Sequence, residues 1–298
     1  MGAIVTTLGI RHRTAYRYQS PVALGPHRLM LRPRESRELR LCAFEVEVTP
    51  VASLAWANDV FGNVVATAYF QGLTDHLEIL CRSTIELDAV AWPVFDIDAA
   101  AIHYPFRYSA DEVIDLGALA VAGHPDPTGR LRAWAGSFVR GNPTDTLALL
   151  KDMCTGISAW ISYQDRDDEG TQAPLETLDR GWGSCRDFAL LFVEAVRSLG
   201  FGARIVSGYL DNSRSGNAGA VGGGSTHAWA EVYVPGAGWI TFDPTNRSVG
   251  GLNLIPVAVG RDIRQVMPVA GSFVGAAGAF LEMTVDVQVA PAPAFVGD

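Results

Sequence analysis

Residues 181–200 read GWGSCRDFALLFVEAVRSLG and predict a break in regular structure followed by a buried helix. From Phe188 onward, apolar residues recur at the three- and four-residue spacing of one helix face, and Gly200 suits the left-handed position that ends a helix. The glycines interrupt regular structure just before Cys185, which places its thiol on the first turn. There the helix dipole stabilises a thiolate, and free backbone N–H groups can face an oxyanion. The segment therefore predicts a nucleophilic cysteine.

The alternative for Cys185 is a buried structural cysteine, because cysteine often packs as a small apolar residue. Cys42, Cys81 and Cys154 are interpreted in that way, since each falls on the apolar side of an expected strand or helix. The four cysteines are too far apart for a disulfide framework or for paired CxxC metal ligands. Their spacing favours a reducing compartment.

A candidate base and a candidate orienting group follow downstream, as thiol catalysis requires. A strand is predicted by THAWAEVYV, residues 226–234, in which alternate apolar residues from Ala228 onward face the core. His227 falls on the opposite face, so we expect it to lie outside the core. A turn then leads to WITFD, residues 239–243, which predicts the partner strand of a hairpin.

Matching the apolar faces of the two strands fixes the register of this hairpin. Tyr233 then pairs with Trp239, and Asp243 lies diagonal to His227 on the same face. Such neighbours are about 7 to 8 Å apart between backbones, so the carboxylate can hold the imidazole through one nitrogen. The other nitrogen is left to face Cys185, whereas a shift of one residue would put Asp243 on the wrong face. For Asp243 alone, a turn residue before proline is the alternative.

Four segments together resemble the core signature of the bacterial transglutaminase-like superfamily, with cysteine, histidine and aspartate in that order. They are GSCRDFA (183–189), GYL (208–210), HAWAEVY (227–233) and GWITFDPTN (238–246). The resemblance covers roughly residues 144–246. The region before it also resembles the β module that precedes this core in many bacterial members, through the segments YRY (16–18), LRPR (31–34) and FGN (61–63).

The resemblance implies a papain-like α+β fold, in which a helix that carries the cysteine packs on an antiparallel sheet. It implies that Cys185 is the nucleophile, that His227 is the general base and acid, and that Asp243 orients His227. The implied reaction is thiolate attack on an amide carbonyl, followed by discharge of the thioester. Water as acceptor gives a cysteine protease or amidase, the favoured function, and an amine gives a transamidase. A catalytically silent binding or scaffold protein is a third alternative, against which the intact triad argues.

Two domains are expected from the length and from the change of sequence pattern. Residues 1–105 are predicted to form an antiparallel β domain, and residues 106–298 the catalytic domain. Period-two alternation characterises the first part and is clearest over residues 76–88. Pro93 and Pro105 punctuate a less regular connection between the two.

Helical spacing begins after this connection. One helix is expected to end near Ile161, with Asn142 as its N-cap and Pro143 at its first helical position. Strands are expected again at residues 203–210, in the hairpin described above, and at residues 283–289.

The composition is that of a globular, acidic chain. Hydrophobic residues make up 48% of the 298 residues and charged residues 18%, which excludes an intrinsically disordered protein. The net charge of −9 is opposite to the basic surface that nucleic-acid binding needs, so no nucleic-acid partner is expected. No stretch approaches the roughly 20 apolar residues of a membrane span, and the first residues lack a signal-peptide pattern. We therefore expect a cytoplasmic protein with no membrane partner. The thiol chemistry that the resemblance implies predicts a polypeptide or amide substrate.

The second oxyanion donor has three candidates, Trp182, Gln164 and Gln172. Each offers an N–H group near the start of the catalytic helix in sequence. For Trp182, packing is the favoured alternative. No cofactor is expected, because the thiol chemistry needs none.

Two further motifs are weak. Residues 165–176 approach an EF-hand calcium loop, but Glu169 stands where Asp or Asn is usual and Pro174 interrupts the loop. They are interpreted as an acidic loop, and no metal is predicted. The glycine-rich residues 213–225 lack the lysine of a phosphate-binding loop and are expected to form a flexible loop, with a lid as the hypothesis.

Overall fold

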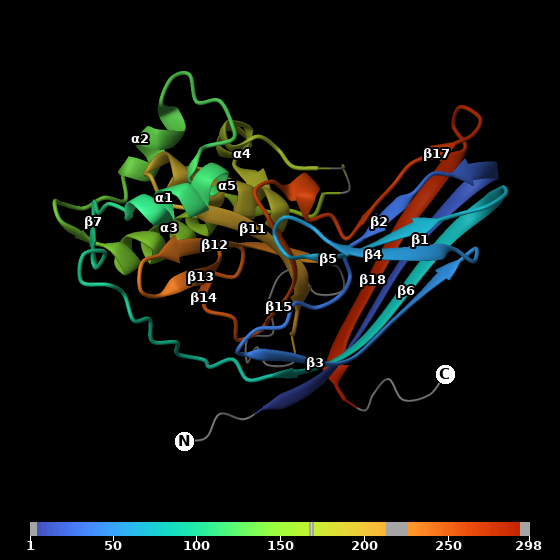
Figure 1. Cartoon of the computed structure of the whole chain (residues 1–298). Coiled ribbons are helices and arrows are strands. Elements are labelled where there is room, and N and C mark those ends of the chain that lie inside the picture. Colours follow the sequence, from blue (N-terminus) through green and yellow to red (C-terminus); the bar gives the residue numbers. More distant parts are fainter. Residues whose placement is uncertain (1–4, 167, 169, 213–225, 293–298) are drawn as a thin grey trace.

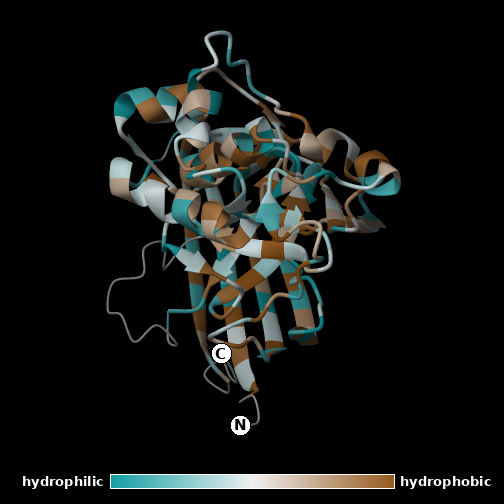
Figure 2. Ribbon diagram, turned by 90° about the vertical axis from the view of Figure 1, so that its left-hand side faces the viewer, coloured by the Kyte–Doolittle hydropathy of each residue, from teal (hydrophilic) through white to brown (hydrophobic). Residues whose placement is uncertain are grey.

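The computed structural model describes residues 5–166, 168, 170–212 and 226–292. Two long antiparallel strands, β1 (Thr6–Leu24) and β6 (Thr74–Leu87), form the centre of its larger β sheet (Figure 1). Every second residue of β6 from Leu77 onward is buried, which confirms the strand predicted there. The same alternation is visible in Figure 2, where strands change between hydrophilic and hydrophobic residues along their length.

Strands from the far end of the sequence complete this sheet. β18 (Phe280–Pro291) runs antiparallel to β1 along most of its length, and β17 (Phe273–Val274) pairs with the last residues of β1. The strand predicted at residues 283–289 is thus confirmed and is longer than expected. A smaller sheet packs against the larger one. Its strands are β2 (His27–Leu29), β4 (Ser53–Asn58), β5 (Val64–Tyr69) and β16 (Val269–Ala270).

We call these two sheets together the β module. The division into residues 1–105 and 106–298 stays a prediction, but strand pairing crosses it, because β16, β17 and β18 all join sheets that begin before residue 90. The β module therefore draws on both ends of the described chain.

The outer strand of the larger sheet, β3 (Leu39–Thr49), corrects one expectation. Its pairing with β6 shifts register between Leu41 and Ala43, so a β-bulge lies at Cys42. The Cys42 side chain is exposed instead of lying on the apolar side of the strand. Alternation alone could not locate a bulge, because the extra residue changes which face the following side chains occupy.

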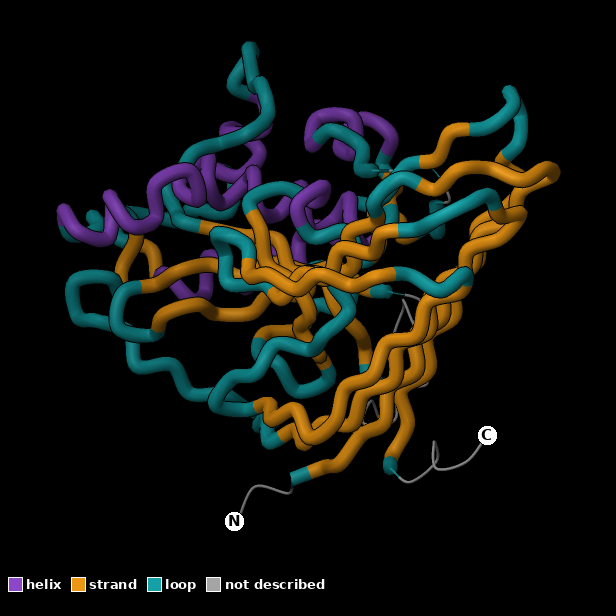
Figure 3. Tube along the Cα trace, turned by 45° about the vertical axis from the view of Figure 1, so that its right-hand side comes forward, coloured by secondary structure: helices purple, strands orange, loops and turns teal. Residues whose placement is uncertain are grey.

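A second antiparallel sheet, with strand order β14-β13-β12-β11-β15, forms with its helices the part of the molecule that we call the core. The strands are β11 (Ala203–Leu210), β12 (His227–Val234), β13 (Gly238–Asp243), β14 (Ser248–Val249) and β15 (Leu254–Gly260). Helix α5 (Cys185–Ser198) packs on β12 and β11, and α3 (Thr146–Trp160) packs beside it. Figure 3 shows the helices gathered on one side of the strands. The fold is therefore α+β, as predicted.

The start of α3 differs from the expectation. Its N-cap is Asp145, whose carboxylate accepts a hydrogen bond from the backbone N–H of Ala148 at 2.7 Å, and neither Asn142 nor Pro143 is helical. Residues 144 and 145 instead form a short strand, β8 (Thr144–Asp145), which pairs with β7 (His103–Tyr104). Because of this pairing, α3 begins at Thr146, three residues after the predicted start at Pro143.

The remaining elements are short. They are α1 (Ala110–Leu116), η1 (Gly117–Ala120), α2 (Arg130–Gly136), β9 (Ser162–Tyr163), α4 (Pro174–Arg180), β10 (Trp182–Gly183) and η2 (Ile263–Gln265).

The β module and the core share a continuous apolar contact. Leu8 and Ile10 of β1 are buried together with Tyr209 of β11 and Ile255 of β15. The helices cover one face of the core sheet, and the β module lies against the opposite side. Both faces of the core strands are therefore withdrawn from water where these layers overlap.

Candidate active site

Cys185 is the first residue of α5, where the sequence predicted it, and it is 7% exposed. Ser184 is the N-cap, so the Cys185 thiol lies at the positive end of the helix dipole. The helix ends before Gly200, whose φ of 97° is the left-handed conformation predicted for it.

A buried carboxylate holds the first turn of α5 in place. Asp187 is fully buried and accepts hydrogen bonds from the Ser184 backbone N–H at 2.8 Å and from the Ser184 hydroxyl at 2.9 Å. Its other oxygen accepts from the Gln172 backbone N–H at 2.7 Å and from Arg166 Nη2 at 3.2 Å. The carboxylate therefore ties the turn that carries Cys185 to the preceding loop.

Asp187→Asn is expected to destabilise the fold by about 3 to 5 kcal/mol, because the Arg166 cation loses its charged partner inside the protein. Urea unfolding followed by circular dichroism measures the change. Asp168→Asn is the matched control, since Asp168 meets the same arginine at 3.5 Å but its side chain is 79% exposed. Equal midpoints for the two variants would contradict the role assigned to Asp187.

The β12–β13 hairpin has the register that the apolar alternation predicted. Tyr233 pairs with Trp239, and Ala230 with Phe242. His227 is the first residue of β12 and Asp243 is the last of β13, so the two meet at one end of the hairpin. His227 Nε2 lies 2.9 Å from Asp243 Oδ2.

His227 is not outside the core, which corrects the expectation. It is 1% exposed, and its ring stacks on Trp229 with centroids 5.9 Å apart. Trp229 itself packs with Val206 and Leu254, so this face of the sheet is apolar as well. The alternation in β12 distinguished the two faces correctly but could not show that a second layer covers the polar one.

The His227–Asp243 pair carries opposite charges. Burial opposes the charged form of His227, but Asp243 and contacts with Cys185 outweigh it and raise the pKa of His227 to about 10. Burial also opposes the charge on Asp243, yet His227 and Asn246 lower the pKa of that carboxyl. Nδ1 of His227 makes no standard hydrogen bond within the described residues. It is the ring nitrogen left for the Cys185 sulfur.

Asn246 is a site residue to which sequence reasoning gave no role. Its amide nitrogen donates to Asp243 Oδ2 at 2.8 Å and lies 3.5 Å from His227 Nε2. Asp243 Oδ1 accepts the backbone N–H groups of Thr245 at 3.0 Å and Asn246 at 3.2 Å. The Asp-Pro-Thr-Asn segment carried a signal for this turn. In an Asx turn, an aspartate side chain accepts hydrogen bonds from the backbone N–H groups of the residues that follow it.

The three oxyanion candidates lie in different surroundings. The Gln164 side chain is exposed, and its backbone N–H already donates to the Gly183 carbonyl at 3.0 Å. Trp182 is half-buried, with the Arg180 guanidinium 5.3 Å from its ring centroid, as expected of a packing residue. Gln172 is 4% exposed, and neither atom of its side-chain amide has a hydrogen-bond partner in the described part of the chain.

The structure describes only part of the two weak motifs. In the 165–176 segment, Asp165 accepts the Tyr163 hydroxyl and Glu176 pairs with Arg180 at 2.7 Å. The described residues contain no group of three or more His, Cys, Asp or Glu arranged to hold a metal ion. The glycine-rich segment 213–225 lies outside the described residues, so the structure does not test the lid hypothesis.

Comparisons with known proteins agree with these observations. Residues 8–86 match the bacterial transglutaminase-like N-terminal region, and residues 132–244 match the transglutaminase-like superfamily. An uncharacterized protein of Mycobacterium tuberculosis is 28% identical over 291 residues, covering 93% of this chain and 91% of its own length. One of Mycobacterium leprae is 26% identical over 287 residues, covering 93% and 96%.

The fold also matches a solved structure. A crystal structure from Cytophaga hutchinsonii, provisionally described as a cysteine protease, superposes with a TM-score of 0.72 at 18% identity. The match covers 96% of this chain and 91% of the other. At that identity, the likeness shows a shared fold. Among the described residues, none of the helices is long and apolar enough to cross a membrane.

Proposed function

The chain belongs to the transglutaminase-like superfamily, and we propose that it hydrolyses peptide or amide bonds with Cys185 as the nucleophile. The proposal is carried by the arrangement of three side chains. A thiol lies on the first turn of α5, and the imidazolium that interacts with it is held at 2.9 Å by a buried carboxylate. This is the nucleophile, base and orienting group of thiol catalysis.

In the first half of the reaction, the Cys185 thiolate attacks the carbonyl carbon of the substrate amide, and the C–N bond breaks. His227 gives its Nδ1 proton to the leaving amine, and a thioester remains on Cys185. In the second half, His227 takes a proton from water as the water oxygen attacks the thioester. The carboxylic acid departs, and the proton restores the imidazolium beside the thiolate. Asp243 keeps its charge and stabilises the imidazolium throughout.

The negative oxygen formed in each attack needs donors close to Cys185. The first N–H groups of a helix have no partner inside it, so the backbone N–H of Cys185 is one donor. We assign the second to the Gln172 side chain. Among the residues that the structure describes, this buried side-chain donor has no hydrogen-bond partner, and the Gln172 backbone N–H is bonded to Asp187 on the same first turn of α5.

Water is the acceptor in this proposal, and transfer to an amine, which is favoured where water is excluded from the thioester, is the alternative. Mass spectrometry of a peptide library, incubated with the protein in the presence and absence of a primary amine, tests the point. New peptide termini in both samples support hydrolysis. Amine adducts on glutamine, without new termini, would show transamidation instead of hydrolysis. An unchanged library would contradict both reactions.

A further inference from the structure

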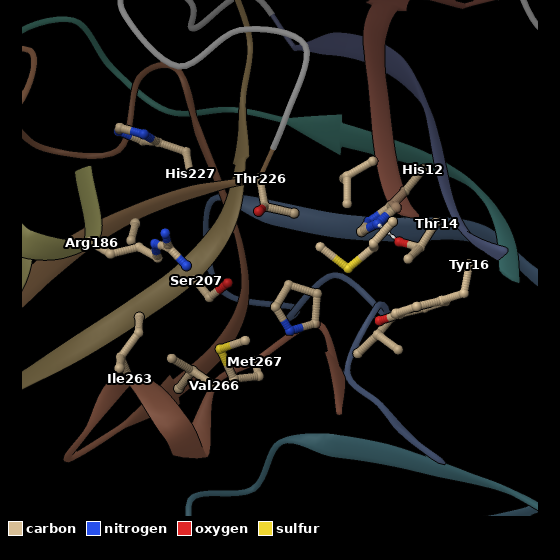
Figure 4. Close-up of a pocket in the computed structure, with 15 residues that line it drawn as sticks. His12, Thr14, Tyr16, Arg186, Ser207, Thr226, His227, Ile263, Val266 and Met267 are labelled. Atoms are coloured by element: carbon tan, nitrogen blue, oxygen red, sulfur yellow. Dashed lines mark hydrogen bonds between the residues drawn. The ribbon is translucent and has the colours of Figure 1, made fainter. Parts of the chain in front are cut away.

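A cavity of about 130 Å³ lies between the β module and the core, beside His227 (Figure 4). We call it the intermodule cavity. The β module contributes Tyr16 of β1 together with Met283 and Val285 of β18, and the core contributes Val266 and Met267, which follow η2. Met283 is half exposed, so the wall on the β18 side can be reached from solvent.

The wall of the intermodule cavity is largely apolar and uncharged on the side of β1. His12 and Thr14 line it, but their polar atoms are bonded within the wall, because His12 Nε2 meets the Thr14 hydroxyl at 2.9 Å and His12 Nδ1 meets the Tyr209 hydroxyl at 3.0 Å. Burial lowers the pKa of His12 to about 4 in spite of nearby Asp286. The His12 ring is therefore neutral at pH 7, and a group bound in the cavity contacts a mostly apolar surface on this side.

On its other side the cavity reaches one residue of the candidate active site. His227 belongs to its wall, and so does Arg186, which follows Cys185 on the first turn of α5. Arg186 Nη2 donates to the backbone carbonyls of Arg166 at 3.0 Å and Asp168 at 3.1 Å. Within the described part of the chain Arg186 forms no ion pair, so its positive charge at the cavity edge opposes a basic guest.

The volume decides what kind of guest fits. Pockets for whole small-molecule ligands measure roughly 300 to 1,000 Å³, well above this cavity. An engineered apolar cavity of about 150 Å³ accepts a benzene-sized molecule, which is the size of one leucine, methionine or phenylalanine side chain. The intermodule cavity therefore accommodates a single apolar side chain and not an entire ligand.

We propose that the intermodule cavity is a specificity pocket, which binds an apolar side chain of the peptide segment whose carbonyl Cys185 attacks. The inference rests on the proposed hydrolase function and names its substrate class. That class is peptides with a leucine, methionine or phenylalanine next to the cleaved bond on the acyl side, and without lysine or arginine there. The β module thereby acquires a role, since β1 and β18 supply one wall of the pocket.

Binding can be measured without turnover. In Cys185→Ala protein carrying 13C-methyl methionine, we expect N-acetyl-leucine methylamide to shift the methyl signals of Met267 and Met283 in a saturable way. Met153 is buried in α3 and is absent from the cavity wall, so its signal should stay in place. N-acetyl-lysine methylamide should leave all three unchanged. Equal shifts of all three with the leucine compound, or none, would overturn the pocket.

Specificity is measured with a substitution at the rim. Wild-type protein should cleave leucine peptides roughly 10- to 100-fold better than alanine peptides in kcat/KM. Met283→Trp should reduce that ratio to near one by filling the cavity. Leu281→Trp is the matched control, because Leu281 is a similarly exposed residue of β18 outside the cavity wall, and should keep the ratio.

The outcomes separate the two proposals. Cleavage with the same leucine-to-alanine ratio in wild type and both variants would overturn the pocket and leave the hydrolase in place. Leucine-specific shifts of Met267 and Met283, with no cleavage of any peptide, would support the pocket and contradict the hydrolase.

Discussion

Cys185→Ala is expected to abolish peptide cleavage in a protein that remains folded. The substitution removes the sulfur that forms the thioester, so turnover should fall by roughly 10³-fold or more. The thiol is small and lies at the end of a helix, so the free energy of unfolding should change by about 1 kcal/mol or less. Cleavage of the most responsive library peptide, together with urea unfolding, measures both quantities. A folded variant that cleaves peptides at the wild-type rate would show that Cys185 is not the nucleophile.

Alkylation by iodoacetamide reports on the same thiol independently of substrate. Cys42 is an exposed free cysteine at the β3 bulge and serves as the reference inside the same chain. Cys185 should be alkylated faster than Cys42 at pH 7 despite its burial, because it lies on the first turn of α5, where the helix dipole favours a nucleophilic thiol, and beside the charged His227 ring. His227→Ala should remove this advantage. Wild-type protein in which Cys42 reacts faster would favour a structural cysteine and a catalytically silent protein.

Asp243→Asn is expected to lower turnover by roughly 10²- to 10⁴-fold, by analogy with removal of the buried carboxylate from a serine protease triad. The asparagine has nearly the same shape, but it neither stabilises the imidazolium nor fixes the ring as the carboxylate does at 2.9 Å. Steady-state kinetics should show the loss mainly in kcat. Asp179→Asn is the matched control, since that aspartate is exposed and pairs with Arg130 on the surface.

The pH dependence of activity tests whether Asp243 acts through His227. In wild-type protein, activity should persist until the imidazolium is lost as the pH approaches about 10, the raised pKa of His227. The charge of Asp243 is a main cause of that raised pKa, so Asp243→Asn should move the alkaline limb to lower pH. An alkaline limb at the same pH in both proteins would show that Asp243 does not act through His227.

The same pair makes folding stability depend on pH. Because the pKa of His227 is higher in the folded protein than its ordinary value of 6.5, its contribution is fully present below about 6.5 and is lost as the pH rises to about 10. The free energy of unfolding should therefore decline across this window in wild-type protein. In Asp243→Asn the decline should be shallower.

The local parts of the site could be predicted from the sequence because each rests on short-range patterns. Helical spacing after Phe188 placed Cys185 on the first turn of α5. Strand alternation fixed the pairing of Tyr233 with Trp239, which brought Asp243 to His227. Such patterns depend on which residues share a face, and the sequence carries that information directly.

The features that escaped prediction depend on contacts between distant segments. The burial of His227 follows from a second apolar layer, and the Arg166–Asp187 pair joins residues of a loop and a helix that no periodicity relates. The bulge at Cys42 and the delayed start of α3 at Thr146 result from pairing with neighbouring strands. The intermodule cavity has the same origin, because its walls come from both ends of the described chain.

The pairing of β18 with β1 has a consequence for how the protein is made. Arg11 of β1 and Asp286 of β18 are joined by an ion pair although 275 positions separate them. A ribosome adds roughly 5 to 20 residues per second, so β18 leaves the exit tunnel many seconds after β1. At the end of that time the nascent polypeptide already contains Cys185, His227 and Asp243, but one wall of the intermodule cavity is still missing. The proposed side-chain pocket can therefore form only after β18 has been translated.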